Sequence, residues 1–461
     1  MNSLLWVRRD LRLHDNPSLS ASIKNGAKKA VYISTPQQWS YHHESPIKID
    51  LIKRHLEQYS LQLASQGIEL VHLQANDYAD QVQTLKHYCV NNHIEQVFAN
   101  AEPELNEIER DKQVQQQLDI QLELFDCDAI APKGKILNQQ GEMFKSFTPF
   151  KRVWLSYVRQ FGIDYSLTPD VSTKRGNKLD IPFDYPKADS GHWPLSQTVL
   201  EKVLPDFFTN KLELYSRQRD FPAIKGTSGL SAYLNIGAIS ARWVTAKLIE
   251  RDPDILYDSE HPAASWLNEL IWRDFYKHLL YHFPELIRGH NFKSGFEHLI
   301  WKNDPKDFDA WCNGYTGYPI VDAAMRQLTQ TGWMHNRLRM ITASFLTKHL
   351  LIDWRWGEQF FMSHLIDGDF SANNGGWQWV AGTGCDAQPY FRIFNPITQS
   401  KKFDPNGEFI RKYLPELANV PDKHVHFPHE YLEKNEMSHL YWPSIVEHKF
   451  ARLRALDFYK R

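Results

Sequence analysis

The first 128 residues alternate short apolar runs with longer segments of helical periodicity. The apolar runs, typical of strands buried on both faces, lie at residues 4–7, 30–34, 68–73, 97–100 and 122–125. Helical periodicity covers residues 47–66, 78–91 and 102–117, and a further helix is expected after Asn16-Pro17. Strands that alternate with helices predict an α/β domain with a five-stranded, parallel, Rossmann-like sheet.

Residues 129–200 interrupt this alternation. One helix is expected at residues 148–161, and the rest is rich in Pro, Asp, Ser and Lys without hydrophobic periodicity. Long irregular segments of this kind commonly join domains. We therefore predict an interdomain linker at residues 129–200, between an α/β domain at residues 1–128 and a second domain at residues 201–461.

The second domain shows helical periodicity and almost no strand alternation. Helices are expected at residues 230–236, 243–251, 263–283, 320–330, 336–350 and 358–365. This part is thus predicted to be all-α. Of the 15 tryptophans in the chain, only four precede residue 221. The two domains are therefore expected to do different work.

The composition of the 461 residues excludes several classes of protein. No apolar run reaches the length of a membrane span, and the N-terminus lacks the apolar stretch of a signal peptide. The four cysteines are scattered without a CxxC pair, so we expect neither a disulfide framework nor a metal site. We expect a cytoplasmic protein without membrane association. With a net charge of −2, DNA contact would need a local basic patch.

A dense polar and aromatic patch lies at residues 332–340. Asn336, Arg339 and Met340 are spaced i, i+3 and i+4, so on a helix they share one face. That face joins an amide, a guanidinium and a thioether, a combination that a core helix does not need. The patch indicates a pocket for a large, flat, polar ligand.

A second patch at residues 367–379 offers two carboxylates, two amides and two tryptophans. Trp377 and Trp379 are two positions apart, so on a helix they face nearly opposite sides and are expected to do different work. A structural alternative stays open. Arg339 could form a buried ion pair with an aspartate of this patch, and the tryptophans could be core residues.

Two further segments carry candidate chemistry. The sequence Gly-Thr-Ser-Gly-Leu-Ser at residues 226–231 precedes a helix, which suits phosphate binding, although ordinary N-capping is the alternative. In the next long helix Trp266, Glu269 and Arg273 form one stripe. A glutamate on such a stripe is costly to bury unless it has a partner, which a heteroaromatic ligand would supply. A Glu269–Arg273 surface pair is the alternative.

In the α/β domain, the turn after the first strand is rich in arginine and lacks the glycines of a dinucleotide fingerprint. Nicotinamide binding is therefore not expected. Polar clusters follow the second strand, at residues 42–44, and the fourth, at residues 106–107. Ligands of open parallel sheets bind at these carboxyl ends, although solvated loop residues would look the same.

Together these segments resemble the photolyase/cryptochrome family, and most closely its bacterial class I photolyases for cyclobutane pyrimidine dimers (CPDs). The resemblance covers essentially the whole chain, with long motifs at residues 6–16, 226–231, 266–276, 316–339 and 366–395. It implies an antenna-binding α/β domain and a helical domain that binds FAD and DNA. It also implies an enzyme, a carbon–carbon lyase, that repairs pyrimidine dimers in UV-damaged DNA with blue light.

The resemblance implies which residues hold FAD. The phosphate side would be held by Tyr215, Thr227, Ser228, Gly229, Leu230 and Ser231. The rest of the cofactor would be lined by Trp266, Glu269, Arg273, Asn336, Arg339, Asp367, Gly368, Asp369 and Asn373. Asn373 would lie near the flavin N5 and favour the reduced anionic form, which is the active one. Gly229 replaces an arginine of a close relative and leaves the loop backbone accessible.

The implied reaction transfers one electron from excited, reduced FAD to a flipped-out dimer, whose cyclobutane ring splits before the electron returns. The implied catalytic residues are Glu269, Asn336 and Asn373, with Glu269 stabilising the dimer radical anion. Trp301, Trp354 and Trp377 match the tryptophan chain that photoreduces oxidised flavin. Implied contacts to the dimer or DNA strand are Arg219, Trp272, Arg337, Met340, Trp379, Arg392, Gln399 and Lys402.

In the α/β domain, His42, Asn106 and Glu107 match positions that bind a folate antenna in close relatives. Arg288 replaces a lysine expected near the folate, and arginine also meets a carboxylate. The resemblance therefore implies 5,10-methenyltetrahydrofolate as the antenna. A deazaflavin or a second flavin is the alternative.

Other functions compete with CPD repair. A cryptochrome-type blue-light receptor is the main alternative, but plant and animal cryptochromes usually carry Asp or Cys where this chain has Asn373. A (6-4) photolyase would carry a histidine at Asn336, and a light-independent flavin oxidoreductase would not need the tryptophan chain. We expect a monomer without an obligate protein partner, associated with the nucleoid when bound to DNA.

Overall fold

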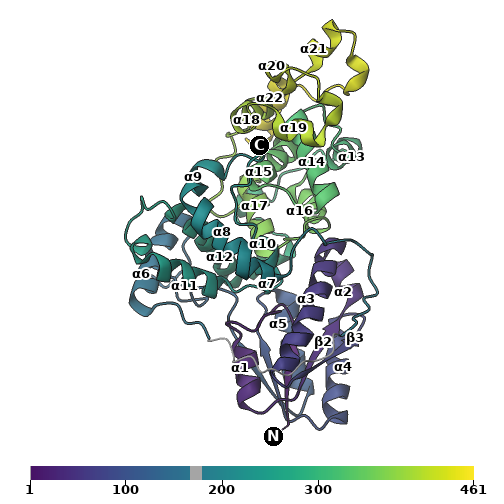
Figure 1. The fold of residues 1–461 in the computed structure, drawn as a ribbon. Coiled ribbons are helices and arrows are strands. Elements are labelled where there is room, and N and C mark those ends of the chain that lie inside the picture. Colours follow the sequence, from purple (N-terminus) through teal and green to yellow (C-terminus); the bar gives the residue numbers. More distant parts are fainter. Residues whose placement is uncertain (1, 167–178, 461) are drawn as a thin grey trace. The chain divides into compact units, whose positions relative to one another are not determined.

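The computed structural model describes residues 2–166 and 179–460 (Figure 1). Residues 167–178 of the expected linker lie outside this range. The chain forms two compact units. Unit 1 comprises Met1–Leu212, Ser228–Ile287 and Asp367–Ser371, and unit 2 comprises Glu213–Thr227, Arg288–Ile366 and Ala372–Arg461. The functional division at residues 128 and 200 stays a prediction.

The parallel sheet of unit 1 has the order β3-β2-β1-β4-β5. Its strands are β1 (Ser3–Val7), β2 (Lys29–Ser34), β3 (Glu69–Gln74), β4 (Gln96–Asn100) and β5 (Gln121–Phe125). All residues of the central strand β1 are buried, with Leu4 in register with Lys29 of β2 and Val97 of β4. The predicted fold class is confirmed, because uninterrupted apolar runs mark strands that are buried on both faces.

The helices around the sheet are α1 (Pro17–Lys24), α2 (Pro36–Tyr41), α3 (Pro46–Ser65), α4 (Tyr78–Asn91) and α5 (Leu105–Gln117). Local sequence explains where several begin. Asn16, Ser45 and Asp77 each accept a backbone hydrogen bond as N-caps, and proline occupies the first turn of α1, α2 and α3. The short α2 was not predicted, and it places His42 at the carboxyl end of β2.

The remaining α-helices of unit 1 among the described residues are α6 (Phe147–Phe161), α7 (Ser196–Thr198), α8 (Leu204–Asp206), α10 (Ser231–Asn235), α11 (Ala241–Arg251) and α12 (Ala264–His282). Buried Asp274 of α12 ties several segments together. Its carboxylate accepts hydrogen bonds from the backbone of Ile130 and Ala131 and from Trp154 Nε1, all between 2.8 and 3.1 Å. Because these donors lie deep in the protein, losing their acceptor would leave them unpaired.

Unit 2 is helical in its described residues. Its α-helices are α9 (Tyr215–Gln218), α13 (Pro305–Cys312), α14 (Pro319–Thr331), α15 (Asn336–Ser344), α16 (Trp354–Met362), α17 (Phe370–Ala381, whose first two residues belong to unit 1), α18 (Pro396–Phe403), α19 (Glu408–Tyr413), α20 (Asp422–Val425), α21 (His429–Lys434) and α22 (His448–Phe458). Buried Asp322 of α14 accepts hydrogen bonds from Tyr441 and Trp442, which fixes the C-terminal segment on the core.

Several predicted helix bounds in this half were wrong. The helix expected at residues 336–350 ends at Ser344 and continues as a π-helical turn, Phe345–His349. The helix expected at residues 358–365 is α16, which begins at Trp354. The helices after residue 396 were not predicted, because most are too short to show a 3.6-residue period. No helix among the described residues combines the length and apolar character that crossing a membrane requires.

Candidate cofactor and substrate site

The Asp367-Gly368-Asp369 segment is built into unit 1, although the chain on both sides of it belongs to unit 2. Two side chains hold its central carbonyl group. Lys48 Nζ and Asn235 Nδ2 donate to the Gly368 carbonyl oxygen at 3.0 and 2.9 Å. These donors come from α3 and α10, so two elements distant in sequence position the segment.

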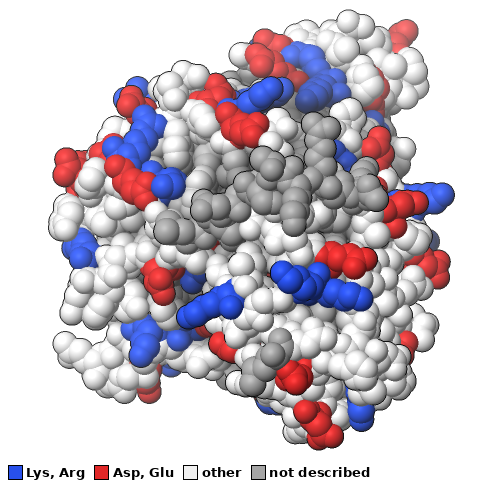
Figure 2. Space-filling view, turned by 60° about the horizontal axis from the view of Figure 1, so that its bottom comes forward, with Lys and Arg blue, Asp and Glu red and all other residues white. Residues whose placement is uncertain are grey.

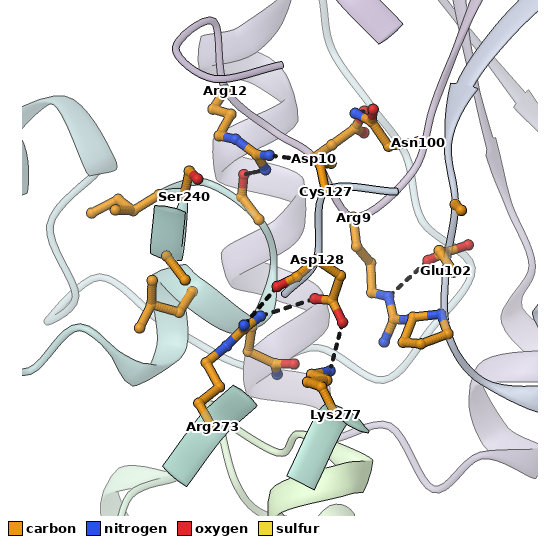
Figure 3. A pocket seen from close by; sticks show the side chains of 17 residues that line it. Arg9, Asp10, Arg12, Asn100, Glu102, Cys127, Asp128, Ser240, Arg273 and Lys277 are labelled. Atoms are coloured by element: carbon orange, nitrogen blue, oxygen red, sulfur yellow. Dashed lines mark hydrogen bonds and ion pairs between the residues drawn. The ribbon is translucent and has the colours of Figure 1, made fainter. Parts of the chain in front are cut away.

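Asp369 also joins a buried charge network with α12. Lys277 Nζ donates to Asp369 Oδ2 at 2.8 Å and lies 3.3 Å from Asp128 Oδ2. Arg273 donates to Asp128 Oδ1 at 2.9 Å and to the Asp128 carbonyl oxygen at 2.6 Å. Figure 3 shows Arg273 and Lys277 meeting at Asp128. Asp128 thus bridges two cations, and Lys277 bridges two carboxylates.

The network keeps its carboxylates ionised. Burial alone would raise the pKa of Asp369 and of Asp128, but Lys277 and Arg273 outweigh this desolvation and hold both pKa values far below the usual range. Conversely, burial would lower the pKa of Arg273 and of Lys277, but the carboxylates outweigh it and raise both. All four groups are therefore charged at neutral pH.

This network lines a polar pocket of about 540 Å³, open solvent included. Figure 3 shows Arg9 reaching Glu102, with Arg9 Nε 2.7 Å from Glu102 Oε1. Arg12 donates to the carbonyl oxygens of Asp15 and Gly237, each at 2.9 Å. Each of these cations therefore already has partners in the pocket wall, a carboxylate for Arg9 and carbonyl oxygens for Arg12.

The predicted stripe of α12 is only partly exposed. Trp266 is buried against Phe207 and Phe208, with ring centroids 5.1 and 5.6 Å apart. Glu269 is half-buried, and Arg273 pairs with Asp128 as described. Trp266 thus contributes to the core of unit 1 as well as to the stripe.

Trp272 is held rigidly on the same helix. Its ring is parallel to that of Phe147, with centroids 3.7 Å apart and planes inclined by 3°. Phe275 meets Trp272 edge-on at 5.5 Å, and Tyr276 stacks against it at 5.6 Å. Such a cluster fixes the rotamer of a half-buried tryptophan before any ligand arrives.

The segment at residues 228–231 and its neighbours fit a cofactor with phosphates and polar ring edges. Gly229 has φ 68°, and a Cβ there would meet nothing within 4 Å, so this side of the loop is open. The Oδ1 atoms of Asn235 and Asn268 are buried without a hydrogen-bond partner among the described residues. Serine hydroxyls, an open glycine turn and unsatisfied amide oxygens suit the polar groups of FAD.

In unit 2, α15 gives the predicted face. Leu338 and Ile341 point into the core, whereas Asn336 is exposed and Arg339 and Met340 are half-buried. Arg339 Nε donates to the Met334 carbonyl oxygen at 2.8 Å, which fixes the guanidinium along the helix. The helical spacing therefore brings the amide, guanidinium and thioether together as expected.

Other predicted residues of unit 2 differ in how they are held. Arg337 Nη2 pairs with Asp220 Oδ1 at 2.9 Å, and its guanidinium lies 4.4 Å from the Phe403 ring centroid. Tyr215 is buried, and Thr227 is half-buried. The guanidinium of Arg219 lies 5.8 Å from the centroid of the Tyr215 ring. Among the predicted strand contacts, the exposed ones are Arg392 and Lys402, and Gln399 is half-buried.

The two tryptophans of α17 are placed differently, as their spacing predicted. Trp377 is 2% exposed, whereas Trp379 is half-buried. Asn373 Nδ2 donates to the Glu358 carbonyl oxygen at 3.0 Å, and Asn374 Nδ2 donates to Glu358 Oε1 at 2.9 Å. Glu358 of α16 therefore fixes the position of Asn373.

The three tryptophans of the predicted electron chain range from buried to partly exposed. Trp377 and Trp354 are buried, and Trp354 Nε1 donates to Asn291 Oδ1 at 3.0 Å. Trp301 is half-buried and packs 5.1 Å from the ring of Phe458. Trp377 also contacts buried Trp311, with centroids 6.1 Å apart, which the sequence patterns did not single out.

A second pocket lies at the carboxyl ends of β1 and β2 and measures about 650 Å³, open solvent included. His42 and Glu107 line it, and Asn106 Nδ2 lies 2.8 Å from His42 Nε2. The pKa of Glu107 is raised to about 7 by burial and by neighbouring Glu104, while Tyr78 donates to it at 2.7 Å. Of the predicted cluster, His42 and Glu107 therefore line this pocket, and Asn106 contacts His42 from outside the lining. Arg288 belongs to unit 2 and is exposed.

Comparison with known proteins bears on the whole chain. The family model described as DNA photolyase matches residues 3–169, and the one described as FAD binding domain of DNA photolyase matches residues 266–461. A deoxyribodipyrimidine photo-lyase of Vibrio cholerae is 46% identical over 99% of both chains.

The chain belongs to the DNA photolyase family.

Solved structures agree with this assignment. An archaeal photolyase from Sulfolobus tokodaii with two FAD molecules has a TM-score of 0.81 at 28% identity and covers 100% of both chains. A cryptochrome from Synechocystis sp. has a TM-score of 0.86 at 25% identity over 99% of both chains. Photolyases and cryptochromes therefore share the fold of this chain, and FAD is its expected cofactor.

The sequence patterns missed the residues that support the site. Lys48, Asp128, Lys277 and Glu358 contact predicted site residues, yet each stands in a segment that reads as an ordinary amphipathic helix or loop. One signal was available for Lys277. It follows Arg273 at i+4, and two cations on a largely apolar helix need acidic partners.

A pH-dependent stability is expected from Glu358. Burial raises its pKa from 4.5 to about 7, outweighing the hydrogen bond from Asn374. Because the pKa of Glu358 is higher in the folded protein than in the unfolded chain, the protonated group stabilises the fold fully below pH 4.5. This stabilisation is lost as the pH rises from 4.5 through 7. The free energy of unfolding should therefore fall by about 3 kcal/mol in total, at roughly 1.4 kcal/mol for each unit of pKa.

In Glu358→Gln this pH-dependent loss should disappear. Urea unfolding from pH 4 to pH 8, with exposed Glu433→Gln as the control, measures it. Parallel profiles for wild type and Glu358→Gln would contradict the raised pKa.

Proposed function

We propose that this chain, as a deoxyribodipyrimidine photolyase, uses light to repair cyclobutane pyrimidine dimers in UV-damaged DNA. The observation that carries the proposal is its 46% identity, over 99% of both chains, to a protein of that name. The residues expected at the cofactor and dimer sites are present and in helical register. Function therefore rests on whole-chain similarity, and the roles below on geometry.

FAD, when bound, supplies the photoexcited electron that the dimer receives. Residues 227–231 would hold its phosphates, with Tyr215 beside them. Arg273, Asp367 and Asp369 would bind its polar edges, and the Asp128–Lys277 network supports this geometry. The remaining lining would come from Trp266, Glu269, Asn336, Arg339, Gly368 and Asn373.

The chain's own residues would receive the dimer outside the duplex. Trp272, held by Phe147, and Trp379 would form the aromatic walls. Asn336 and Met340 lie on one face of α15 and would touch the base edges and ring. Glu269 would donate a hydrogen bond where negative charge develops on the dimer. The hydrogen bond from Glu269 would strengthen as the dimer becomes charged, whereas the aromatic walls would bind both states.

Strand contacts would come from Arg219, Arg392, Gln399 and Lys402. Arg337 pairs with Asp220 and stacks on Phe403, so a phosphate contact would have to compete with that ion pair. On the face shown in Figure 2, blue cationic and red acidic side chains are interspersed. Because the net charge of the whole chain is −2, affinity for DNA would depend on a few placed cations and weaken with added salt.

Trp377, Trp354 and Trp301 would carry electrons from the protein surface to oxidised flavin. The burial of Trp377 and Trp354 and the partial exposure of Trp301 fit that direction. The amide of Asn373, anchored on Glu358, would favour the reduced anionic cofactor. The enzyme would restore its active form in this way without a nicotinamide site.

The antenna would occupy the pocket at the carboxyl ends of β1 and β2. His42 and Glu107 supply polar groups, Tyr32 and Trp39 supply aromatic walls, and Asn106 contacts His42. We propose 5,10-methenyltetrahydrofolate, with Arg288 near its carboxylate end. A deazaflavin or second flavin is the alternative, which the two FAD molecules of the Sulfolobus relative favour.

The enzyme would act as a monomer in the cytoplasm, and associate with the nucleoid through its substrate. One dimer for each flavin requires no second subunit. A cryptochrome-type signalling role is the competing function, since a Synechocystis cryptochrome shares the fold. A (6-4) photolyase is less well supported, because Asn336 stands where that class places a histidine.

Glu269→Ala should keep FAD but lose repair. A hydrogen bond to a charged group is worth about 1.5–3 kcal/mol, so ring splitting would slow relative to electron return and the quantum yield would fall several-fold. Quantum yield is measured on a thymine-dimer oligonucleotide with chemically reduced protein. Exposed Glu260→Ala is the control, and an unchanged yield in Glu269→Ala would remove its proposed role.

Trp301→Phe should block photoreduction of oxidised flavin by an external thiol, because the surface end of the electron chain is lost. Repair by chemically reduced protein should be unaffected. Flavin absorbance under blue light measures photoreduction, and the thymine-dimer oligonucleotide assay measures repair. Normal photoreduction would mean that electrons reach the flavin by another route. Trp311, which contacts Trp377, would be the first candidate for that route.

Glu107→Gln should weaken binding of 5,10-methenyltetrahydrofolate several-fold, because the amide carries neither the carboxyl O–H nor the negative charge that Glu107 can offer. Exposed Glu109→Gln on the same helix should bind as wild type does. Fluorescence titration measures both. Tighter binding of a deazaflavin than of folate to the wild type would replace the folate assignment.

A further inference from the structure

Lys48 is a buried cation that joins the wall of the antenna pocket to the Asp367–Asp369 segment. Its side chain is fully enclosed, with the residue 1% exposed. Nζ lies 2.6 Å from Glu44 Oε2 and donates to the Gly368 carbonyl oxygen at 3.0 Å. An enclosed ammonium group is costly unless such partners compensate it. The position of Lys48 is therefore specified by both contacts.

The local sequence places Lys48 where it can make both contacts. Ser45 caps α3 and accepts the Lys48 backbone N–H at 3.3 Å, so the lysine lies in the first turn of the helix. Lys48 and Glu44 both line the antenna pocket, together with His42 and Glu107. The same ammonium group therefore belongs to the pocket wall and to the support of Gly368.

The second contact reaches the proposed flavin ligands. Gly368 stands between Asp367 and Asp369, and its carbonyl group is shared by Lys48 and Asn235. Lys277 holds Asp369 from α12. Of these three supports, only Lys48 also lines the antenna pocket. It is thus the side chain through which a change in that pocket reaches the segment directly.

We propose that Lys48 is a positioning residue shared by both chromophore sites. It fixes the Asp367–Asp369 segment for FAD and holds Glu44 in the wall of the antenna pocket. The inference rests on the proposed function, which assigns a chromophore to each site. An antenna that orders the Glu44–Lys48 pair also orders Gly368, so each chromophore strengthens the binding of the other, by the same factor in both directions.

The test compares Lys48→Met with Lys53→Met, a control on the same helix whose lysine pairs with Glu57 at 3.9 Å outside both pockets. Full-length apoprotein is titrated with FAD and, separately, with 5,10-methenyltetrahydrofolate. Loss of one charge-assisted hydrogen bond predicts that Lys48→Met weakens FAD binding about ten-fold. It should also weaken folate binding and shift the visible absorption bands of bound flavin. Lys53→Met should match wild type.

The decisive measurement is the factor by which bound folate changes the affinity for FAD. In wild type, saturating folate should tighten FAD binding several-fold, and in Lys48→Met this factor should fall to one. Glu44→Gln keeps the hydrogen bond to Gly368 but removes the ion pair, so it should also lower the factor. This milder variant serves if Lys48→Met does not fold.

The possible outcomes distinguish failure of the proposed function from failure of the proposal for Lys48. A wild type that binds neither FAD nor folate contradicts the proposed function itself. If the wild type binds both, but Lys48→Met matches Lys53→Met in affinities, flavin spectrum and linkage, Lys48 is not a positioning residue. Weaker FAD binding with an unchanged spectrum and unchanged linkage would show a purely structural role and would also overturn the proposal.

Discussion

The structure of the candidate site depends on a buried network in which Arg273 and Lys277 are held between Asp128 and Asp369. Charges in such a place persist only when each is paired, and removing one partner costs about 3–5 kcal/mol. The network joins the end of the parallel sheet, α12 and the segment at residues 367–371. It therefore sets where the proposed flavin ligands can be, before any cofactor arrives.

Aromatic packing fixes the tryptophans proposed for the dimer wall and for the electron chain. Phe147 covers one face of Trp272 in a parallel stack, and Phe361 packs against Trp377 at 4.9 Å. Gly357 is required beside Trp377, because a Cβ there would lie 2.1 Å from its ring. Rigid aromatic groups bind a planar ligand with little loss of conformational entropy. Both the charged and the aromatic side chains of the site are therefore held in place before a ligand binds.

The sequence predicted the sheet closely, because strands buried on both faces are continuous apolar runs between turn residues. It also predicted the shared face of Asn336, Arg339 and Met340, since helical spacing alone determines it. It could not predict that Lys48 is enclosed. A lysine in the first turn of an amphipathic helix normally faces solvent, and only the tertiary fold brings the Gly368 carbonyl group to it.

The ends of helices and the partners of buried charges could not be predicted from the sequence either. The π-helical turn after Ser344 consists of buried residues, and the periodicity of residues 336–350 continues through it. Asp128 follows the last strand and reads as a turn residue, yet it bridges two cations of α12. Contacts between segments far apart in sequence leave no local pattern, so the supports of the site became visible only in the structure.

The most direct test is repair of a thymine-dimer oligonucleotide by chemically reduced, FAD-loaded protein, in blue light and in darkness. Intact thymines should return only in the light. Protein that carries FAD and binds the damaged strand but restores no thymines in the light would contradict the proposed repair, and would favour a light-sensing role.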